Sequence, residues 1–542
     1  MRTKYIFVVG GVMSGVGKGT TSAALGLTLK AKGYNVTAIK IDPYVNIDAG
    51  TMNPVEHGEV FVTVDGDETD QDIGTYERYL DIDITKLNYM TTGRVYQSVI
   101  ERERNMEYKG KCVEVVPHVP EEIIFRIERA ADKAKADIAI IEVGGTVGEY
   151  QNILFLEAAR IMKVTDPDNV RFVLVTYLPV PPSIGEMKTK PSQYAVRTLN
   201  SAGIQPDFIV GRSVIQMDQP RKEKIAHFCS VPWSRIIGAP DVASIYDIPE
   251  MFEEQGFATK VLDSFGLEAK QNDLNDWLNF NKKVHEAKDT VKIGVIGKYF
   301  STGNFTISDA YISVLEAIKH AAAYEGVKAE VSWLNSEEYE AYPENLKELS
   351  DYDGIIIPGG FGSRGIDGKI KVIEYIRKNQ IPYLGLCYGM QCAVIEYARN
   401  VLGWDDAHTT EINENTAHPV IHTMAGQDLN IRENKLGGTL RLGAFPCQVK
   451  DKTFSRTAYK TSTISERHRH RFEFNNAYRA ELEQAGLVIA GTSPDNRLVE
   501  IIEIKNHPFF VGVQFHPEFQ SRPLRPHPLF KGLIKAAKRM KD

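Results

Sequence analysis

The sequence lacks any apolar run long enough to cross a bilayer, and it has few cysteines. A membrane-spanning helix needs about 20 consecutive, predominantly apolar residues, whereas polar or charged side chains interrupt every apolar stretch here. The 542 residues include five cysteines, an odd number with uneven spacing and no Cys-x-x-Cys pair. These features argue against a membrane role, a disulfide framework and a zinc-type cysteine cluster. They predict a protein of a reducing compartment, the cytoplasm.

An excess of positive charge is also lacking. Lys and Arg total 64 against 71 Asp and Glu, which gives a net charge of -7 at pH 7. Because phosphate backbones attract broad basic surfaces, this balance argues against nonspecific nucleic-acid binding, although local lysines can still bind small anionic substrates. Residues 1–10 contain an apolar stretch too short for the core of a signal peptide, so we expect a β-strand there.

Short β-branched runs alternate with helical stretches along the whole chain. This pattern predicts an α/β protein with two doubly wound, mostly parallel-sheet domains. A polar stretch interrupts the pattern, which places the domains at residues 1–266 and 291–542 with a linker at 267–290. The strands are expected at residues 5–9, 36–41, 138–143, 172–178 and 208–211, and then at 291–296, 354–358, 383–386, 487–490, 499–504 and 510–515.

A glycine-rich loop follows the first expected strand. Residues 10–21 read GGVMSGVGKGTT and lead into an Ala/Leu-rich helical stretch. Glycines let backbone N–H groups turn towards phosphate oxygens, the helix N-terminus adds its positive end, and Lys18 supplies a mobile cation. Val12 replaces the first glycine of the standard pattern, and Gly19 stands where Ser or Thr usually binds magnesium, so Thr20 is the candidate for that role. The context favours a nucleoside triphosphate site over an incidental glycine turn.

Two carboxylates are candidates for holding a divalent cation beside such phosphates. Glu142 ends the expected strand 138–143, and ligands of open parallel sheets bind beyond the carboxyl ends of the strands. Asp72 lies in an acidic stretch, 65–72, that is also typical of a solvated loop. The residues alone therefore favour Glu142 over Asp72.

The second half carries a candidate nucleophile. Cys387 follows the expected strand 383–386 in the run GLCYGMQ. A sharp strand-to-helix turn of this kind exposes the sulfur at the top of a sheet and places it at a helix N-terminus, whose dipole favours the reactive thiolate. Taken alone, the segment is also compatible with a buried structural cysteine.

The end of the sequence supplies the partners that a nucleophilic cysteine needs. Residues 511–518 read VGVQFHPE, so a histidine and a carboxylate follow another expected strand. His516 can take the proton from Cys387 and later pass it to a leaving group, and Glu518 can hold the imidazole tautomer. These residues predict a Cys387/His516/Glu518 triad.

A second glycine loop completes this candidate site. Residues 358–362 read PGGFG, directly after an expected strand, and a backbone without side chains can aim N–H groups at a developing oxyanion. Gly360 is the preferred donor, with the N–H of Tyr388 as the second. A hairpin-like turn is the alternative interpretation of the loop.

Along essentially its entire length the chain resembles the CTP synthases, which join an amidoligase domain to a class I glutamine amidotransferase domain. The resemblance rests on residues 14–19 (SGVGKG), 141–148 (IEVGGTVG) and 188–193 (KTKPSQ), and on the three motifs of the second half. It implies that ATP phosphorylates the uracil O4 of UTP and that ammonia released from glutamine then displaces the phosphate. Positioning and charge neutralisation carry most of such a phosphoryl transfer.

The resemblance also implies the binding residues of the first domain. ATP is expected to contact Gly15, Val16, Gly17, Lys18, Gly19, Thr20, Lys40 and Asp72, with Mg²⁺ held by Asp72 and Glu142. UTP, and CTP as a feedback inhibitor, are expected to contact Ser14, Glu149, Tyr150, Gln151, Lys188, Thr189, Lys190, Pro191, Ser192, Gln193 and Lys224. Gln151 stands where the family usually has a carboxylate.

In the second domain the resemblance implies a glutamine site. Tyr388 replaces a more usual leucine there, and Arg471 is expected to pair with the α-carboxylate of glutamine. Taken alone, Arg471 belongs to a basic run, 467–471, that is equally compatible with a solvated stretch. The full set of expected glutamine contacts is Gly360, Tyr388, Gly389, Met390, Gln391, Glu411 and Arg471.

The family implies further features beyond these contacts. An ammonia tunnel is expected to involve Pro54, His57 and Val60, and Phe361 with the turn at 364–365 is expected to form a lid through which GTP activates glutamine hydrolysis. Homotetramers and reversible filaments are family traits as well.

Two other interpretations compete. Cobyrinic acid diamide synthases also join a phosphate-loop domain to a class I glutaminase, although residues 188–193 argue against that assignment. The second interpretation is a nucleotide-sensing filament subunit that has lost catalysis. The complete triad and the phosphate loop argue against this interpretation.

Overall fold

The computed structural model describes residues 2–298, 301–302, 305–306, 309–424, 427, 430 and 437–541. The chain forms two compact units. The first unit comprises Met1–Asp48 and Asp72–Asn281, and the second comprises Ala49–Gln71 and Lys282–Asp542. The second unit therefore includes a short segment that the sequence places in the middle of the first domain.

The first unit is built on a seven-stranded sheet in the order β5-β2-β6-β1-β7-β8-β9, and all neighbouring strands are parallel. Its strands are apolar on both faces, as a sheet covered on both sides requires. Phe7 and Phe172, for example, stack at 5.5 Å between ring centroids. The strands are β1 Lys4–Gly10, β2 Val36–Asp42, β5 Tyr89–Thr91, β6 Ile138–Val143, β7 Val170–Tyr177, β8 Phe208–Ser213 and β9 Ile236–Pro240.

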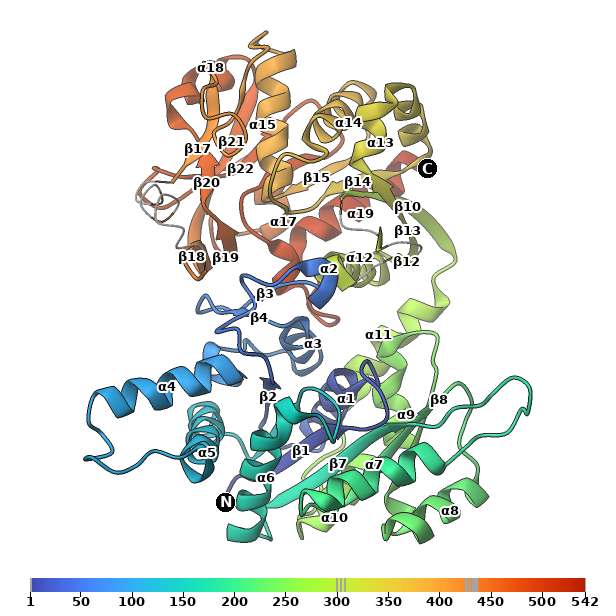
Figure 1. Ribbon diagram of the computed structural model, residues 1–542. Helices are drawn as coiled ribbons and strands as arrows, with labels where there is room; N and C mark the ends of the chain where they lie inside the picture. Colours follow the sequence, from blue (N-terminus) through green and yellow to red (C-terminus); the bar gives the residue numbers. More distant parts are fainter. Residues whose placement is uncertain are drawn as a thin grey trace. The chain divides into compact units, whose positions relative to one another are not determined.

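Helices cover both faces of this sheet (Figure 1). Helices α1, α9 and α10 pack together on one face, and α5 packs with α4 and α6 on the other. The helices are α1 Lys18–Ala31, α3 Gln71–Leu80, α4 Thr92–Arg104, α5 Val115–Ala134, α6 Ile153–Thr165, α7 Lys190–Ser201, α8 Gln219–Cys229, α9 Ile248–Glu254, α10 Phe257–Ser264 and α11 Asn275–Glu286.

The second unit is built on a nine-stranded sheet in the order β13-β10-β14-β15-β23-β22-β21-β18-β19. Neighbours from β13 to β23 are parallel, and those from β23 to β19 are antiparallel. The strands are β10 Asp289–Gly297, β13 Val327–Asn335, β14 Gly354–Ile357, β15 Tyr383–Leu386, β18 Arg441–Val449, β19 Thr463–His470, β21 Leu487–Thr492, β22 Val499–Ile504 and β23 Phe510–Val513.

Helices α12 and α19 cover one face of the second sheet, and α14 and α15 cover the other (Figure 1). Smaller sheets pair β3 with β4 and β11 with β12, and a third sheet places β17 between β16 and β20. The helices are α2 Pro54–His57, α12 Ile312–Glu325, α13 Ser336–Ala341, α14 Ile366–Asn379, α15 Tyr388–Asn400, α17 Phe454–Tyr459, α18 Arg479–Gln484 and α19 Pro528–Lys541; the small strands are β3 Phe61–Val62, β4 Glu68–Thr69, β11 Ser301–Thr302, β12 Phe305–Thr306, β16 His408–Thr409, β17 Pro419–Thr423 and β20 Phe472–Phe474.

The predicted fold class, two α/β domains with parallel sheets, is confirmed. The antiparallel half of the second sheet was not foreseen. The basic run 467–471 is not a solvated stretch, because most of it lies in β19 and the side chains of Arg467, His468 and His470 are at most 2% exposed.

The stretch 267–290 contains α11. Trp277 of α11 is buried, its Nε1 donates a hydrogen bond to the carbonyl of Tyr246 at 2.9 Å, and its ring lies 5.0 Å from that of Tyr79. The first part of this helix is therefore part of the core of the first unit.

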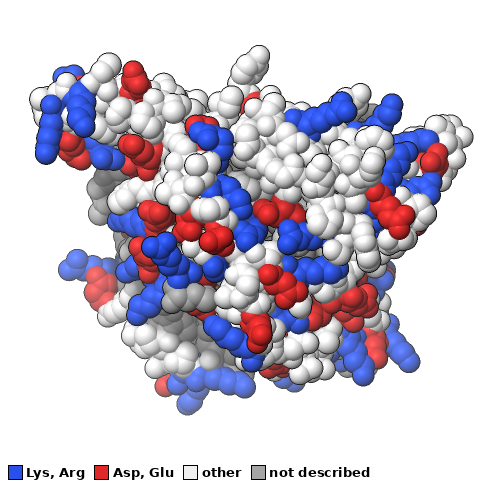
Figure 2. All heavy atoms as spheres, turned by 90° about the horizontal axis from the view of Figure 1, so that it is seen from below, with Lys and Arg blue, Asp and Glu red and all other residues white. Residues whose placement is uncertain are grey.

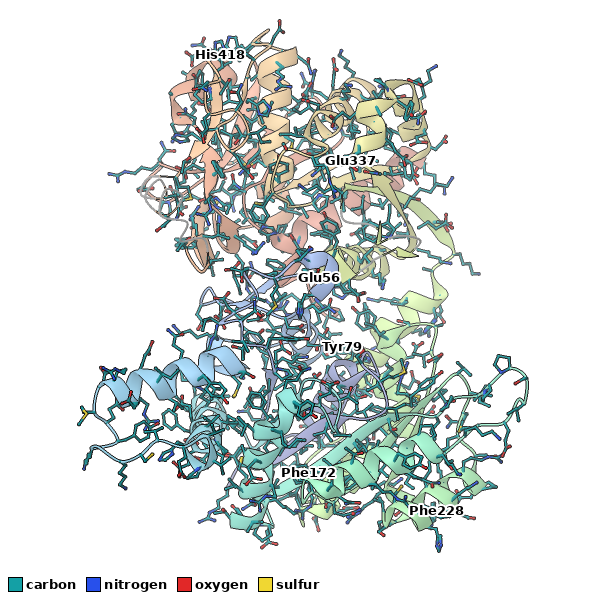
Figure 3. All side chains as sticks on the ribbon, in the orientation of Figure 1. Glu56, Tyr79, Phe172, Phe228, Glu337 and His418 are labelled. Carbon is teal, nitrogen blue, oxygen red and sulfur yellow. The ribbon has the colours of Figure 1, made fainter. Side chains whose placement is uncertain are left out.

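The surface of the described residues carries charges of both signs. On the face shown in Figure 2, basic and acidic side chains are interspersed. Phe172 on β7 is buried, whereas Phe228 on α8 is 56% exposed. Both residues are labelled in Figure 3. Within the described part of the chain, no helix has both the length and the apolar character that crossing a membrane requires.

Candidate active sites

The glycine-rich loop after β1 forms a phosphate-type cradle in the first unit. Gly15 and Gly17 have positive φ angles of 68° and 87°, which glycine adopts without strain, and Gly17 caps the N-terminus of α1. Lys18 is the first residue of α1, and its Nζ donates a hydrogen bond to the carbonyl of Gly145 at 2.9 Å. Burial lowers the pKa of Lys18, and the nearby charges of Glu142 and Asp72 partly oppose that effect. The lysine is thus held beside the loop, close to two carboxylates.

Gly19 departs from the standard phosphate-loop pattern for a steric reason. A Cβ at this position would lie 2.1 Å from Oδ1 of Asp72, so any larger residue would displace that carboxylate. Asp72 stands in the first turn of α3, which brings it over the start of α1. The glycine therefore makes room for an acidic group beside the loop.

Lys40 joins the two candidate metal carboxylates. Its Nζ donates to Oδ2 of Asp72 and to Oε1 of Glu142, the latter at 3.1 Å, and lies 3.6 Å from Oδ1 of Asp42. The hydroxyl of Tyr76 donates to the other oxygen of Glu142. Burial and the neighbouring charge of Asp72 raise the pKa of Glu142, while Lys40 and Lys18 lower it. The structure thus brings together the four residues predicted to bind ATP phosphates and magnesium, namely Lys18, Lys40, Asp72 and Glu142.

This donor set is compatible with magnesium. Mg²⁺ prefers oxygen ligands and is usually held by one or two carboxylates together with substrate phosphates. Asp72 and Glu142 meet at a single ammonium group, which shows that both carboxylates can face one cation. Among the described residues no cluster of three or more His, Cys, Asp or Glu suited to a metal occurs, so phosphate oxygens would have to complete the coordination.

A pocket that the sequence did not reveal adjoins the loop. It has a volume of about 180 Å³. Apolar side chains form much of its wall, and Arg212 pairs with Asp241 at 3.0 Å beside it. Gly17, Thr20 and Thr21 belong to the glycine-rich motif and the start of α1. No short motif marks the other residues, which come from the ends of β8 and β9, from the segment that follows β9, and from α9. The pocket is lined by Gly17, Thr20, Thr21, Arg212, Ala239, Asp241, Val242, Ile245, Ile248 and Phe252.

The residues expected to bind UTP lie on loops near the phosphate cradle and on α7 and α8. A Cβ on Gly11 would lie 2.5 Å from that of Ala195, so the loop that carries Ser14 packs closely on α7. Lys188 and Thr189 directly precede α7, and residues 190–193 form its start, where Ser192 is fully buried and accepts a hydrogen bond from Thr176 at 3.1 Å. The side chain of Ser192 therefore supports the helix and does not face solvent.

The remaining members of the set are more exposed. Gln151 donates a hydrogen bond to Glu149 at 2.8 Å, and Tyr150 between them is 97% exposed. Lys188 pairs with Glu186 at 2.7 Å, and Lys224 is exposed on α8. Glu149 lies close to Gly145, whose carbonyl accepts the hydrogen bond from Lys18. Lys224, in contrast, lies on the surface of the first unit.

Cys387 forms the sharp turn between β15 and α15 in the second unit. Its φ of 48° and ψ of -97° are unusual for a residue with a side chain, and its N–H donates to the carbonyl of Val513 at 2.7 Å. A Cβ on Gly389 would lie 2.3 Å from the carbonyl oxygen of Ile357, so this glycine lets α15 start directly against β14. The thiol thus stands at the N-terminus of α15, as expected for a nucleophile elbow.

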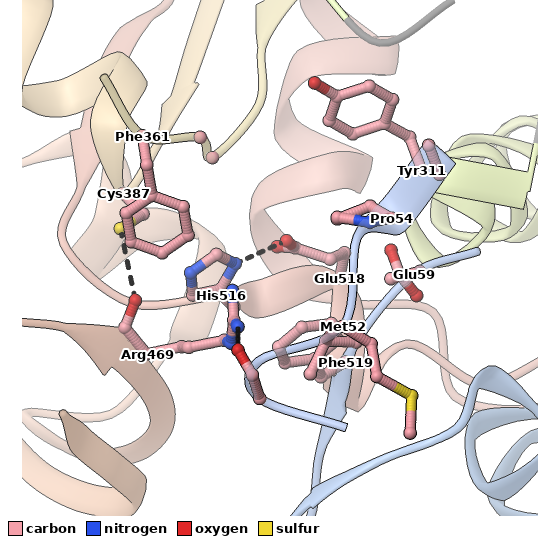
Figure 4. Close-up of a pocket in the computed structure, with 15 residues that line it drawn as sticks. Met52, Pro54, Glu59, Tyr311, Phe361, Cys387, Arg469, His516, Glu518 and Phe519 are labelled. Atoms are coloured by element: carbon pink, nitrogen blue, oxygen red, sulfur yellow. Dashed lines mark hydrogen bonds and ion pairs between the residues drawn. The ribbon is translucent and has the colours of Figure 1, made fainter. Parts of the chain in front are cut away.

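His516 and Glu518 follow β23 and lie beside this turn. Nδ1 of His516 is 2.7 Å from Oε1 of Glu518, and the opposite edge of the ring faces Cys387 (Figure 4). Nε2 of His516 has no hydrogen-bond partner among the residues that the structure describes. Burial lowers the pKa of His516, but the charges of Glu518 and Cys387 outweigh it and raise this pKa to about 10. The geometry favours an imidazolium next to the sulfur.

The glycine loop after β14 lies against the same residues. A Cβ on Gly359 would lie 2.8 Å from Cε1 of His516 and 3.7 Å from Cβ of Cys387. The N–H of Gly362 donates to Oε1 of Glu411 at 2.8 Å, and the hydroxyl of Tyr388 donates to the carbonyl of Gly362 at 2.9 Å. The loop is therefore fixed beside the sulfur by side chains from two other elements.

Other residues expected to contact glutamine surround this loop. Gln391, in the first turn of α15, donates to the carbonyl of Phe472 at 3.0 Å, next to Arg471. Burial lowers the pKa of Arg471, while the charges of Glu68 and Glu411 raise it. Met390 is buried in the core behind the turn, so its side chain is not available to a ligand.

A cavity of about 170 Å³ opens onto the triad (Figure 4). Its wall includes Pro54 and Val60, two of the residues expected in an ammonia tunnel, from the segment Ala49–Gln71 of the same unit. The lining residues are Gly50, Met52, Pro54, Glu59, Val60, Ala310, Tyr311, Gly359, Gly360, Phe361, Cys387, Arg469, His516, Glu518 and Phe519.

Comparisons with known proteins identify relatives of both halves of the chain. Residues 4–267 match the family model "CTP synthase N-terminus", and residues 306–536 match "Glutamine amidotransferase class-I". A protein named "CTP synthase" from Caldanaerobacter subterraneus is 49% identical over 540 residues, which cover 99% of each chain. Another of that name from Acaryochloris marina is 48% identical over 536 residues, 98% of this chain and 95% of the relative.

A solved structure was found for one part of the chain. The Trypanosoma brucei CTPS glutaminase domain with bound acivicin is 39% identical, covers 46% of this chain and 94% of its own, and has a TM-score of 0.42.

Proposed function

The chain belongs to the CTP synthase family of glutamine-hydrolysing ligases, and we propose that it converts UTP, ATP and glutamine into CTP, ADP, phosphate and glutamate. One observation supports this most directly. A single chain carries both the cradle around Lys18, Lys40, Asp72 and Glu142 and the arrangement of Cys387, His516 and Glu518. The cradle can bind the phosphates of a nucleoside triphosphate, and the Cys/His/Glu arrangement can hydrolyse an amide.

In the first unit, the cradle holds ATP and activates UTP. Backbone N–H groups from Gly15 to Thr20 and the ammonium of Lys18 bind the phosphates, and Lys40 neutralises charge between the two carboxylates. Asp72 and Glu142 are the residues that would hold Mg²⁺, which supplies charge neutralisation on the phosphates when bound. Phosphorylation of the uracil O4 converts a poor leaving group into phosphate, which ammonia then displaces.

The start of α7, Ser14 and the turn at 149–151 bind the pyrimidine nucleotide, with Lys224 as a further contact. UTP is the substrate at this site, and CTP occupies part of it as an inhibitor. The pocket beside Thr20 provides a place for the base of ATP, because it adjoins the phosphate loop and several of the residues that line it are apolar.

In the second unit, the thiolate of Cys387 attacks the amide carbon of glutamine. The N–H groups of Gly360 and Tyr388 stabilise the oxyanion, and the imidazolium of His516 protonates the leaving ammonia. Water then attacks the thioester, a proton returns to His516, and glutamate leaves. Glu411, Arg471 and Gln391 hold the substrate, and Glu518 maintains the charge of the imidazole.

Regulation and assembly follow the family in this proposal. GTP activates glutamine hydrolysis through a lid that includes Phe361 and residues 364–365, and the enzyme forms homotetramers and filaments. All five cysteines are free thiols, in keeping with a cytoplasmic enzyme.

Nitrogen tracing tests the proposal. Purified protein is incubated with UTP, ATP, magnesium and glutamine labelled with ¹⁵N in the side-chain amide. The proposal predicts CTP that carries the label on the exocyclic nitrogen, with glutamate and phosphate formed in equal amounts. Glutamate release with no labelled CTP, or turnover of a corrinoid acid in place of UTP, would reject it.

A further inference from the structure

The glycine loop that follows β14 is held by three side chains from separate parts of the chain. Tyr388 of α15 donates its hydroxyl hydrogen to the carbonyl of Gly362 at 2.9 Å, and Glu411 accepts from the N–H of the same residue at 2.8 Å. Lys298, directly after β10, donates through Nζ to the carbonyl of Phe361. These contacts fix the peptide groups that join residues 361 to 362 and 362 to 363. They lie two and three peptide groups after the one that carries the N–H of Gly360, the expected oxyanion donor.

Tyr388 has a second partner beneath its ring. Nζ of Lys369, on α14, lies 4.9 Å from the centroid of the Tyr388 ring, and the lysine side chain is only 1% exposed. A Cβ on Gly360 would lie 3.9 Å from the same nitrogen. The side chain of Lys369, the ring of Tyr388 and the glycine loop at 359–362 therefore form one packed cluster.

The side chain of Lys369 is buried at this contact. Burial lowers the pKa of Lys369, while Cys392 and Glu411 raise it. A cation over an aromatic face gains electrostatic attraction from the ring, the more so when water is excluded. The contact therefore fixes the ring of Tyr388 and aims its hydroxyl at the loop.

A loop of this composition needs such a restraint. Gly359 and Gly360 have no side chains to limit their peptide orientation, and an oxyanion donor acts only when its N–H is already aimed at the developing charge. A leucine at position 388 could supply the backbone N–H but no bond to the carbonyl of Gly362.

We propose that the hydroxyl of Tyr388, whose ring lies over the ammonium of Lys369, is a latch that holds the 359–362 loop in its donating orientation. Tyr388 and Lys369 are then positioning residues for glutamine hydrolysis. This inference rests on the proposed function of the second unit. It goes beyond the role of the Tyr388 backbone, since the side chain acts on the neighbouring loop.

Tyr388→Phe tests the latch because it removes only the hydroxyl and keeps the ring over Lys369. Glutamate release by the full chain is measured as a function of glutamine concentration. We expect kcat to fall about 10-fold, the effect of losing one hydrogen bond of about 1.4 kcal/mol, with KM changed less than about twofold. Lys369→Met, which leaves the hydroxyl but removes the cation, is expected to lower kcat in the same direction.

Tyr397→Phe is the matched control. Tyr397 lies on the same helix, and its hydroxyl donates to the carbonyl of Ala485 at 2.7 Å, away from the loop. This variant is expected to keep the wild-type kcat. The rate at which iodoacetamide alkylates Cys387 is expected to be equal in wild type and Tyr388→Phe, because the latch acts on the oxyanion donor and not on the sulfur.

The outcomes separate the latch from the proposed function. If wild type releases no glutamate, the proposed function of the second unit fails. If wild type is active and Tyr388→Phe has an unchanged kcat, or a loss carried by KM alone, or a slower alkylation of Cys387, the latch is wrong. A loss of kcat in Tyr397→Phe equal to that in Tyr388→Phe would also overturn it.

Discussion

The side chains of His516 and Glu518 lie side by side, with 2.7 Å between Nδ1 of the imidazole and Oε1 of the carboxylate. Pro517 separates them in the chain, and both stand in the short turn after β23. The imidazole is buried, which alone would favour its neutral form, yet the charges of Glu518 and Cys387 raise its pKa to about 10. The carboxylate therefore maintains an imidazolium that can protonate ammonia.

Replacing Glu518 by Gln should remove that charge while keeping the hydrogen bond. His516 is protonated below its folded pKa of about 10, so wild-type glutamine hydrolysis should decline only as pH rises through that value. In Glu518→Gln the pKa falls, and we expect the alkaline decline to move towards neutral pH, with kcat lower by about 100-fold or more. The pH dependence of glutamate release measures both effects. If the alkaline decline in rate occurs at the same pH in Glu518→Gln as in wild type, Glu518 does not maintain the charge of His516.

The two glycines of the donor loop offer a matched pair. An added Cβ at Gly359 meets Cε1 of His516 at 2.8 Å, whereas one at Gly360 meets nothing closer than Nζ of Lys369 at 3.9 Å. Both alanine variants keep their N–H groups. Gly359→Ala should displace the imidazole and lower kcat for glutamine by about 100-fold, since small misplacements have effects of that size. Gly360→Ala should lose clearly less, and the reverse order would argue against this placement of His516.

Gly19→Ala probes the carboxylate beside the phosphate loop. The new Cβ would lie 2.1 Å from Oδ1 of Asp72, so the carboxylate must move. We expect CTP formation to fall by about 100-fold with either glutamine or ammonia as nitrogen source, while glutamate release in the second unit persists. Asp72→Asn should reproduce the loss. Full CTP formation in both variants would exclude a role for Asp72 at this site.

Glu473 predicts a pH dependence of stability. Burial and the charge of Glu500 raise its pKa to about 7, although Arg441 lowers it, and His422 lies 3.8 Å away. Between pH 4.5 and 7 the folded state therefore binds more protons than the unfolded state. We therefore expect stability to fall as pH rises through this range.

Glu473→Gln should remove that decline. Thermal unfolding of the second unit at pH 5 and pH 8 gives the comparison: wild type should lose more stability between these values than the variant does. Glu414→Gln, at an exposed position, is the control and should behave as wild type. Equal losses in wild type and Glu473→Gln would show that Glu473 is charged in the folded state across the range.

Local motifs carried much of what could be predicted from the sequence. The turn around Cys387 and the loop around Lys18 are contiguous segments whose glycines and flanking strands specify their shape. Asp72 and Lys40 are different, because 32 residues separate them along the chain and only the fold brings them together. The resemblance to a family, and not the spacing, pointed to that pair.

Other features had no readable signal. The pocket beside Thr20 is lined by apolar residues such as Ile248 and Phe252, whose pattern does not differ from that of a core. The sequence of the basic run 467–471 was equally compatible with a ligand contact and with a solvated stretch. Arg467 and His468 are buried in the fold, and the contact of Arg467 with the carbonyl of Val62 joins residues far apart in the sequence. The hydroxyl contact of Tyr388 could not be foreseen, since it depends on the folded path of the 359–362 loop.

The most direct test of the account separates the two nitrogen sources. Cys387→Ala and Lys18→Ala are assayed for CTP formation from UTP and ATP, first with glutamine and then with free ammonia. The account predicts that Cys387→Ala forms CTP only with ammonia, whereas Lys18→Ala forms none from either source. Loss of both activities in Cys387→Ala, or retention of glutamine-dependent CTP formation, would contradict two separate half-reactions on this chain.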